Sequence, residues 1–249
     1  MKKKFKKYLS LVFLLLCFIG VLYFSYKIIT YKKDLDVNDN IKNEINEFVI
    51  KENENKYNID FKSLKEKNPD TVAYIKVNNS KIDYVVVKGK DNKYYLKHNF
   101  NKEKNRAGWI FADFHNKFDE SDKNIVIYGH NMNNGSMVGT LKYTMNKEWY
   151  LNEDNYMIDL VTENKIYTYQ VFSIYRIDAE DYYINTIFKT DKEFEKFVKK
   201  IKSRSVYKFN VDVTKNDKIL TLSSCVGIKG KRVALHAKLV EEVDNTWSF

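Results

Sequence analysis

The chain has 249 residues and a formal net charge of +10, which leaves room for one sizeable domain plus appended segments. A basic chain can bind nucleic acid, but these lysines are spread along the whole sequence and accompany no nucleic-acid recognition motif. We therefore disfavour a nucleic-acid partner and attribute the charge to a surface that faces an anionic cell envelope.

The N-terminus is typical of a membrane segment. An almost unbroken apolar run from Leu9 to Tyr26 follows five lysines, and it is long enough to cross a hydrocarbon core as a helix. A cleaved signal peptide is the alternative, but the run is long for one and no small-residue cleavage site follows it. The sequence predicts a cytoplasmic basic tail over 1–8 and an uncleaved signal anchor over 9–29, with the rest of the chain outside the cell.

The segment 30–60 is predicted to join this anchor to a catalytic domain at 61–249. Its apolar residues Ile41, Ile45, Phe48 and Val49 recur at helical spacing, which favours a helical stalk or a helix packed on the domain. A flexible spacer is an equally good interpretation of the residues before Ile41.

Strand patterns dominate the remaining chain. A turn at 68–70 precedes a predicted hairpin of 71–77 and 82–87, and further strands are expected at 109–111, 124–128, 156–161 and 166–177. We expect a short helix at 137–144 capped by Ser136, and an amphipathic helix from Asp191 to Ser203 that starts in a capping box at Thr190. The sequence contains no phosphate-binding loop or metal-ligand cluster of convincing spacing, so no cofactor or metal is expected.

Cys225 is the only cysteine outside the apolar N-terminal segment. It follows a predicted strand at 219–224, on the less apolar face, and a loop with two glycines leads to a second strand that starts at Arg232. This loop would bring Arg232 near Cys225, and a nearby guanidinium favours the thiolate by lowering a thiol pKa that is ordinarily about 8.5. The alternatives are a buried structural thiol at 225 and a solvated charge at 232.

Histidines offer the acid or base that such a thiol needs. His130 follows the predicted strand at 124–128 and precedes a flexible loop, a position from which its side chain can reach a cleft. We expect His98 and His115, in polar loops, to be surface residues. His236 shares a strand face with Arg232, so it is either a partly buried strand residue or a second histidine near the site.

Three ordered motifs resemble the sortases, and class B in particular. They are Asn124-Ile125-Val126-Ile127-Tyr128-Gly129-His130, Thr221-Leu222-Ser223-Ser224-Cys225 and Arg232-Val233-Ala234-Leu235-His236. The predicted helix at 191–203 between two late strands is the mark of class B, and the resemblance covers about 68–240. It implies a mainly β fold with peripheral helices: an eight-stranded β-barrel with N-terminal helices and a helix between two late strands.

The resemblance also implies an activity. Class B sortases are membrane-anchored cysteine transpeptidases of Gram-positive bacteria. They cut a C-terminal sorting signal similar to NPxTx after threonine, form a thioester, and pass the acyl group to a cell-wall amine without a cofactor. The implied partners are secreted proteins that carry such a signal, a peptidoglycan precursor or cross-bridge amine, and the plasma membrane.

Matching positions suggest a role for each site residue. Cys225 would be the nucleophile, His130 the acid and base, and Arg232 the group that holds the substrate and the oxyanion. The residues expected to contact the signal are Ser223, Tyr183, Ile184 and Leu96. Two other classes stay open: a cysteine hydrolase of wall peptides, which usually orients its histidine with Asn or Asp, and a membrane-tethered binding module, which needs neither residue.

Overall fold

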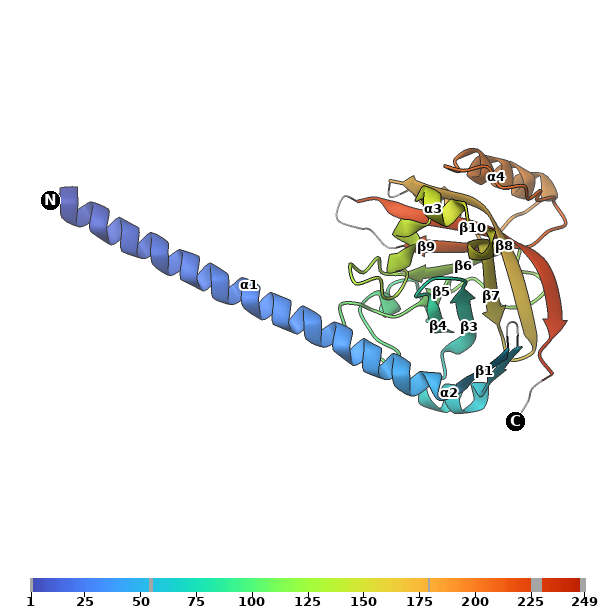
Figure 1. The fold of residues 1–249 in the computed structure, drawn as a ribbon, viewed down its shortest axis with the longest axis horizontal. Helices are drawn as coiled ribbons and strands as arrows, with labels where there is room; N and C mark the ends of the chain where they lie inside the picture. The colour runs from blue at the N-terminus through green and yellow to red at the C-terminus, as the bar shows by residue number, and fades with distance from the viewer. Residues whose placement is uncertain (1, 54–55, 179, 225–229, 247–249) are drawn as a thin grey trace. The chain divides into compact units, whose positions relative to one another are not determined.

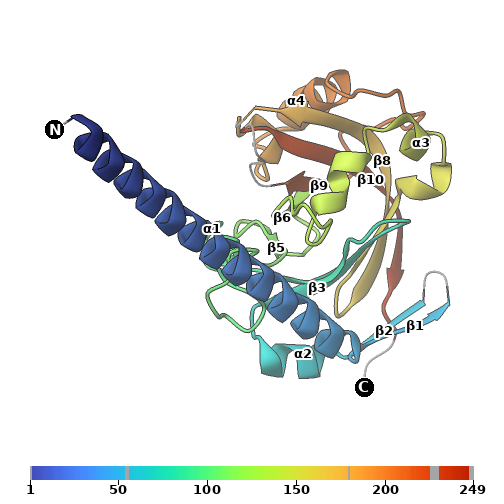
Figure 2. The same cartoon turned by 60° about the vertical axis from the view of Figure 1, so that its left-hand side comes forward.

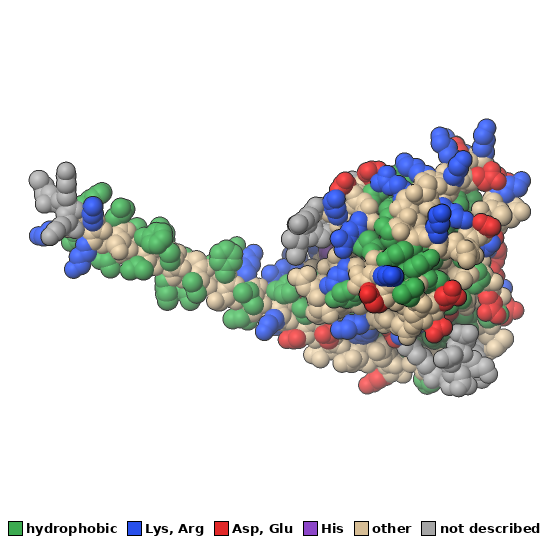
Figure 3. Space-filling model, turned by 45° about the horizontal axis from the view of Figure 1, so that its top comes forward, with side chains coloured by type: hydrophobic (Ala, Val, Ile, Leu, Met, Phe, Trp, Pro, Cys, Tyr) green, Lys and Arg blue, Asp and Glu red, His purple; other side chains and the backbone are tan. Residues whose placement is uncertain are grey.

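The computed structural model describes residues 2–53, 56–178, 180–224 and 230–246. The chain divides into two compact units, 1–40 and 41–249. Helix α1 (Lys2–Asn46) makes up the first unit and continues into the second. Its N-terminal part is long and apolar enough to cross a membrane, and large apolar side chains are exposed along it, as Figure 3 shows. The helix is therefore compatible with a membrane anchor.

Eight strands of the second unit close into a β-barrel in the order β10-β8-β7-β3-β4-β5-β6-β9. Neighbouring strands are antiparallel except in the pairs β4–β5 and β6–β9, which are parallel. Figures 1 and 2 show the strands wrapping around a common interior. Their bounds are β3 (Thr71–Val77), β4 (Asp83–Val87), β5 (Phe111–Ala112), β6 (Asn124–Gly129), β7 (Met157–Val161), β8 (Lys165–Ile177), β9 (Ile219–Ser224) and β10 (Arg232–Asp244). The predicted barrel is thus confirmed.

Helices lie outside the barrel. Helix α2 (Phe61–Lys67) is capped by Asp60, whose carboxylate accepts from Ser63 N, and helix α4 (Asp191–Ser203) is capped by Thr190, whose hydroxyl accepts from Glu193 N. The apolar face of α4 is buried, as its helical spacing predicts, and each such side chain contributes about 1.5–3 kcal/mol to the free energy of unfolding. The remaining helical segments are α3 (Lys147–Tyr150) and 3-10 helices at Tyr94–Leu96, Gly139–Tyr143, Glu153–Tyr156 and Tyr182–Ile184.

Two local predictions are wrong. The helical spacing ends at Ile45, which is buried with Ile41, and Val49 instead starts a hairpin of β1 (Val49–Asn53) and β2 (Lys56–Ile59). Near Ser136 the helix is a 3-10 turn that begins at Gly139, because the Ser136 hydroxyl donates to the Asn134 side chain and caps no helix. A serine hydroxyl that bonds a neighbouring side chain is no longer available to cap a helix, and the sequence alone does not show which bond forms.

Basic side chains are distributed over the second unit. Figure 3 shows lysine and arginine side chains scattered over one face, with acidic side chains between them. Many lysines form exposed ion pairs, for example Lys65 with Glu163 and Lys215 with Asp191. Such exposed pairs contribute about 0–1 kcal/mol each, so this charge affects solubility and partners more than the fold.

Candidate active site

The parallel pairing of β6 with β9 brings two separate motifs to one edge of the barrel. Tyr128 pairs with Ser223 and Gly129 with Ser224, so both strands end at the same level. A cavity of about 350 Å³ opens there. Its lining residues are Asn92, Leu96, Phe111, Tyr128, His130, Asp181, Ile184, Ser223, Ser224 and Arg232. Five of the predicted site residues therefore meet in one cavity: His130, Arg232, Ser223, Ile184 and Leu96.

His130 directly follows β6 and is half-buried. Its Nε2 lies 2.8 Å from the carbonyl oxygen of Leu96. A carbonyl only accepts, so Nε2 must carry the hydrogen. The neutral ring then has its acceptor lone pair on Nδ1, and Leu96 fixes both the tautomer and the orientation of the imidazole.

Arg232 is the first residue of β10, and 23% of its side chain is exposed. Its Nη1 lies 3.2 Å from Asp181 Oδ1 and 3.4 Å from the Glu180 carbonyl oxygen. Burial by itself would lower the pKa of Arg232, but its hydrogen bonds to Tyr183 and Asp181 and the charges of those groups raise it above its ordinary value. The guanidinium is therefore a permanent cation at the cavity wall.

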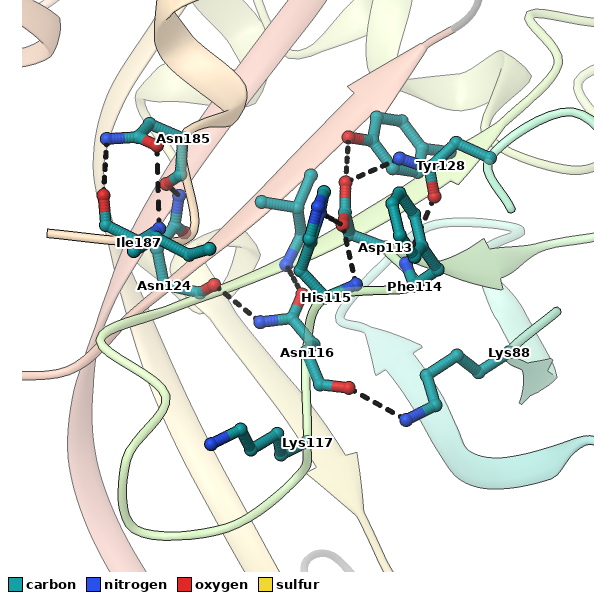
Figure 4. A network of polar contacts seen from close by, with 12 residues as sticks. Lys88, Asp113, Phe114, His115, Asn116, Lys117, Asn124, Tyr128, Asn185 and Ile187 are labelled. Carbon is teal, nitrogen blue, oxygen red and sulfur yellow. Dashed lines mark hydrogen bonds and ion pairs between the residues drawn. The ribbon is translucent and has the colours of Figure 1, made fainter. Parts of the chain in front are cut away.

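Tyr183 links Ser223 to Arg232 at the cavity wall, although it does not itself line the cavity. Its side chain is buried, and its hydroxyl lies 2.8 Å from Ser223 Oγ and also hydrogen-bonds Arg232. The following Ile184 lines the cavity. Next along the chain, Asn185 is held by its carbonyl oxygen, which accepts from Asn124 Nδ2 at 2.9 Å, as seen in Figure 4. The segment 183–185 is thus fixed to both β6 and β9.

Cys225 lies outside the described residues. The residue before it, Ser224, is buried at the cavity wall, and its hydroxyl accepts a 2.7 Å hydrogen bond from Val233 N. Ser224 therefore joins the end of β9 to the start of β10 beside Arg232. The interpretations of Cys225 as a nucleophile or as a structural thiol remain predictions.

Five residues that line the cavity were not predicted as site residues from sequence: Asn92, Phe111, Tyr128, Asp181 and Ser224. Tyr128 was within reach, because it precedes His130 by two positions and strand residues two apart share a face. Asn92 and Asp181 come from loops, where no periodicity indicates the direction of a side chain. The sequence also predicts no carboxylate partner for Arg232, whereas the structure places Asp181 at 3.2 Å from its guanidinium.

The other histidines lie away from the cavity. His115 is exposed, as expected, whereas His98 is half-exposed and stacks on the Tyr94 ring. His236 is fully buried between Thr221 Oγ1 and the Tyr175 hydroxyl, each at 2.9 Å from one ring nitrogen. Its burial lowers the pKa of His236 to about 3, so the ring stays neutral and belongs to a structural polar chain.

Acid should destabilise the protein through His236. The unfolded chain takes up a proton near pH 6.5, whereas the folded state does so only near pH 3, so stability is lost as pH falls between these values. Between these values the free energy of unfolding falls by up to about 1.4 kcal/mol per pH unit, because unfolding takes up one proton. Denaturant midpoints between pH 7 and pH 4 should fall less steeply in His236→Gln than in wild type, and His98→Gln should keep the wild-type slope. Parallel curves for wild type and His236→Gln would contradict this role.

The chain matches known proteins over most of its length. The family model described as "Sortase domain" matches residues 75–240. Sortase B of Staphylococcus aureus is 32% identical over 244 residues, which cover 96% of this chain and 99% of the relative. Among solved structures, sortase B from Bacillus anthracis in complex with AAEK1 aligns with a TM-score of 0.75 and 33% identity, over 84% of this chain and 99% of that one.

A sortase B complexed with triglycine aligns with a TM-score of 0.68 and 34% identity, over 73% of this chain and 85% of that one. The closed barrel, the late helix α4 and the convergence of the three sequence motifs on one edge agree with these similarities. The chain belongs to the sortase family, and it is a cysteine transpeptidase of class B.

Proposed function

We propose that this sortase cleaves a C-terminal sorting signal similar to NPxTx after threonine and holds the acyl fragment as a thioester on Cys225. The acyl group then passes to an amine of the cell wall. The observation that carries the proposal is that His130, Arg232 and Ser224, the residue before Cys225, meet at one cavity.

His130 is the proposed proton donor and acceptor. Its Nε2 hydrogen is used by the Leu96 carbonyl, so the proton that moves is held at Nδ1. Protonated at Nδ1, the ring can give that proton to the departing amine when the amide bond breaks. The neutral ring can then take a proton from the incoming amine. His130 is thus the acid when the amide bond breaks and the base when the new amide bond forms.

Arg232 is the proposed stabiliser of the oxyanion. A thiolate that attacks an amide carbonyl puts negative charge on oxygen, and a fixed guanidinium can donate to that oxygen. Asp181 holds Arg232 at 3.2 Å, but 81% of the Asp181 side chain is exposed. An ion pair with such an exposed carboxylate is weak, so exchanging Asp181 for the substrate oxygen costs little.

The segment 183–185 is the proposed cover of the signal peptide. Ile184 and Leu96 give the cavity apolar surface, and Ser223 adds a hydroxyl to its lining. The hydrogen bond between Tyr183 and Ser223 fixes this segment to β9 at the cavity. This arrangement suits an extended peptide that is held by side-chain pockets.

The anchor supports a location at the plasma membrane. We infer that the N-terminus is cytoplasmic and the catalytic unit extracellular, because lysines cluster ahead of the apolar run. There the enzyme meets secreted proteins and wall precursors on the same side of the membrane. The triglycine bound to the similar sortase B suggests an N-terminal glycine amine as the acceptor.

A peptide library with and without amines tests this function. The purified protein is incubated with NPxTx peptides and scrambled controls, alone or with triglycine, and the products are identified by mass. We expect cleavage after threonine and a transpeptidation product that forms only with triglycine. Hydrolysis alone, unaffected by any added amine, would favour a wall-peptide hydrolase instead.

A further inference from the structure

A buried carboxylate lies behind the wall of the catalytic cavity. Asp113 follows β5 and is 3% exposed. Figure 4 shows it between the Tyr128 ring and His115. The two oxygens of Asp113 have different partners: Oδ1 accepts from His115 N at 2.9 Å and lies 2.7 Å from His115 Nδ1, while Oδ2 faces two residues of the cavity. Asp113 itself does not line the cavity.

Oδ2 of Asp113 holds two cavity residues at once. It accepts from Asn92 Nδ2 at 2.7 Å and from the Tyr128 hydroxyl at 2.7 Å. Asn92 is also held at its other end, because its Oδ1 accepts from Phe114 N at 3.1 Å. Both ends of the Asn92 amide are therefore used, and its orientation at the cavity is fixed.

From these contacts we propose that Asp113 is a positioning residue for the transpeptidase reaction: its carboxylate fixes Asn92 and Tyr128 as one wall of the signal-peptide cavity. Asn92 comes from the loop after β4 and Tyr128 from β6, so the shared acceptor aligns two segments that are separate in the sequence. Tyr128 lies two positions before His130, at the end of the same strand. Fixing Tyr128 therefore also fixes the position of this wall relative to His130.

The hydrogen bonds to Asp113 are of the strong kind. Bonds to an ionised carboxylate are about twice as strong as neutral ones, and a buried carboxylate is tolerated only where donors satisfy it. Burial first, and the charge of Asp113 second, raise the pKa of Tyr128 above its usual value. The phenol therefore stays protonated and keeps donating to the carboxylate.

Asp122 provides a matched control. It lies in the same loop, is also buried, and its carboxylate accepts from Lys117 N at 2.9 Å, from Phe118 N at 2.7 Å and from Asn116 Nδ2 at 3.2 Å. None of these partners lines the cavity. Asp122→Asn therefore changes a second buried, hydrogen-bonded carboxylate without changing a partner that lines the cavity.

The test is kcat/KM of the full-length protein in detergent with a sorting peptide, below the melting temperature of each variant. Asp113→Asn keeps the size but replaces one acceptor oxygen with a donor, so we expect a loss of about tenfold or more, mostly in KM. Asp122→Asn should lower the melting temperature and leave kcat/KM within about twofold of wild type. An Asp113→Asn variant within that range, or an equal loss in Asp122→Asn, would overturn the proposal.

A double-mutant cycle gives the second readout. Tyr128→Phe removes one donor to Asp113, so the Asp113→Asn and Tyr128→Phe losses in kcat/KM should be less than multiplicative when combined. Independent losses would contradict positioning through Tyr128. If Asp113→Asn does not fold, Asn92→Ala and Tyr128→Phe decide the matter, because wild-type kcat/KM in both overturns the proposal.

The proposal rests on the proposed function only for the choice of peptide. A wild type that cleaves no NPxTx peptide contradicts that signal alone, and Asp113 is then tested with whichever library peptide the wild type does cleave.

Discussion

Replacing Arg232 with alanine is expected to lower kcat for a sorting peptide on the order of 10²-fold or more. This loss corresponds to roughly 3 kcal/mol of transition-state stabilisation, the usual effect of removing one oxyanion donor. Arg232→Lys should also fall well below wild type, because a lysine keeps the charge but loses the planar fork of donors. The measurement is kcat with a fluorogenic signal peptide at saturating concentration.

Thermal stability should move little in these variants. The ion-pair partner of Arg232, the Asp181 carboxylate, is largely exposed, and pairs with an exposed partner contribute about 1 kcal/mol or less to the free energy of unfolding. Lys231→Ala is the matched control, since Lys231 precedes Arg232 and, among the described residues, forms a long 3.9 Å ion pair with Asp178. Near-wild-type turnover in Arg232→Ala would remove the catalytic role and make Lys229 or Lys231 the next candidates.

The Cys225→Ala change is expected to abolish turnover, with a loss on the order of 10³-fold or more, because it removes the thiol that forms the acyl-enzyme. Cys17, the second cysteine of the chain, lies in the apolar helix, so Cys17→Ala in the full-length protein should keep wild-type turnover. Comparing both variants with wild type under the same conditions separates loss of the nucleophile from a general effect of removing cysteine.

Alkylation decides between the two interpretations of Cys225. A catalytic thiol should react in the folded protein, and its rate against pH should change when His130 is replaced, since the two groups would titrate as a pair. Labelling of Cys225 only after unfolding would instead indicate a structural thiol.

Long periodic patterns predicted the barrel well. The apolar runs in 71–77 and 124–128 and the Tyr/Val/Ile-rich stretch in 166–177 predict strands, and most of their side chains are buried in the barrel. The apolar spacing in α4 predicts that helix for the same reason. The β1–β2 hairpin was missed because Phe48 and Val49 also fit the helical spacing that begins at Ile41.

The site could be predicted only in part. His130 and Arg232 stand at strand ends, where the neighbouring β6, β9 and β10 must bring them together once the barrel closes. Asp181 and Asn92 come from loops, whose paths follow from contacts such as those of Asp113 and Arg232 and not from any local pattern. Sequence alone therefore predicts which strand-end residues meet at the cavity better than it predicts the loop residues of its wall.

The most direct test of the central claim is the intact mass of the enzyme after brief reaction with an NPxTx peptide and an acid quench. We predict a mass increase equal to the peptide up to its threonine, absent in Cys225→Ala and removed from the wild type by hydroxylamine or by triglycine, with the matching transfer product in solution. Turnover without any acylated enzyme, or an acyl group that remains in Cys225→Ala, would contradict thioester transfer through Cys225.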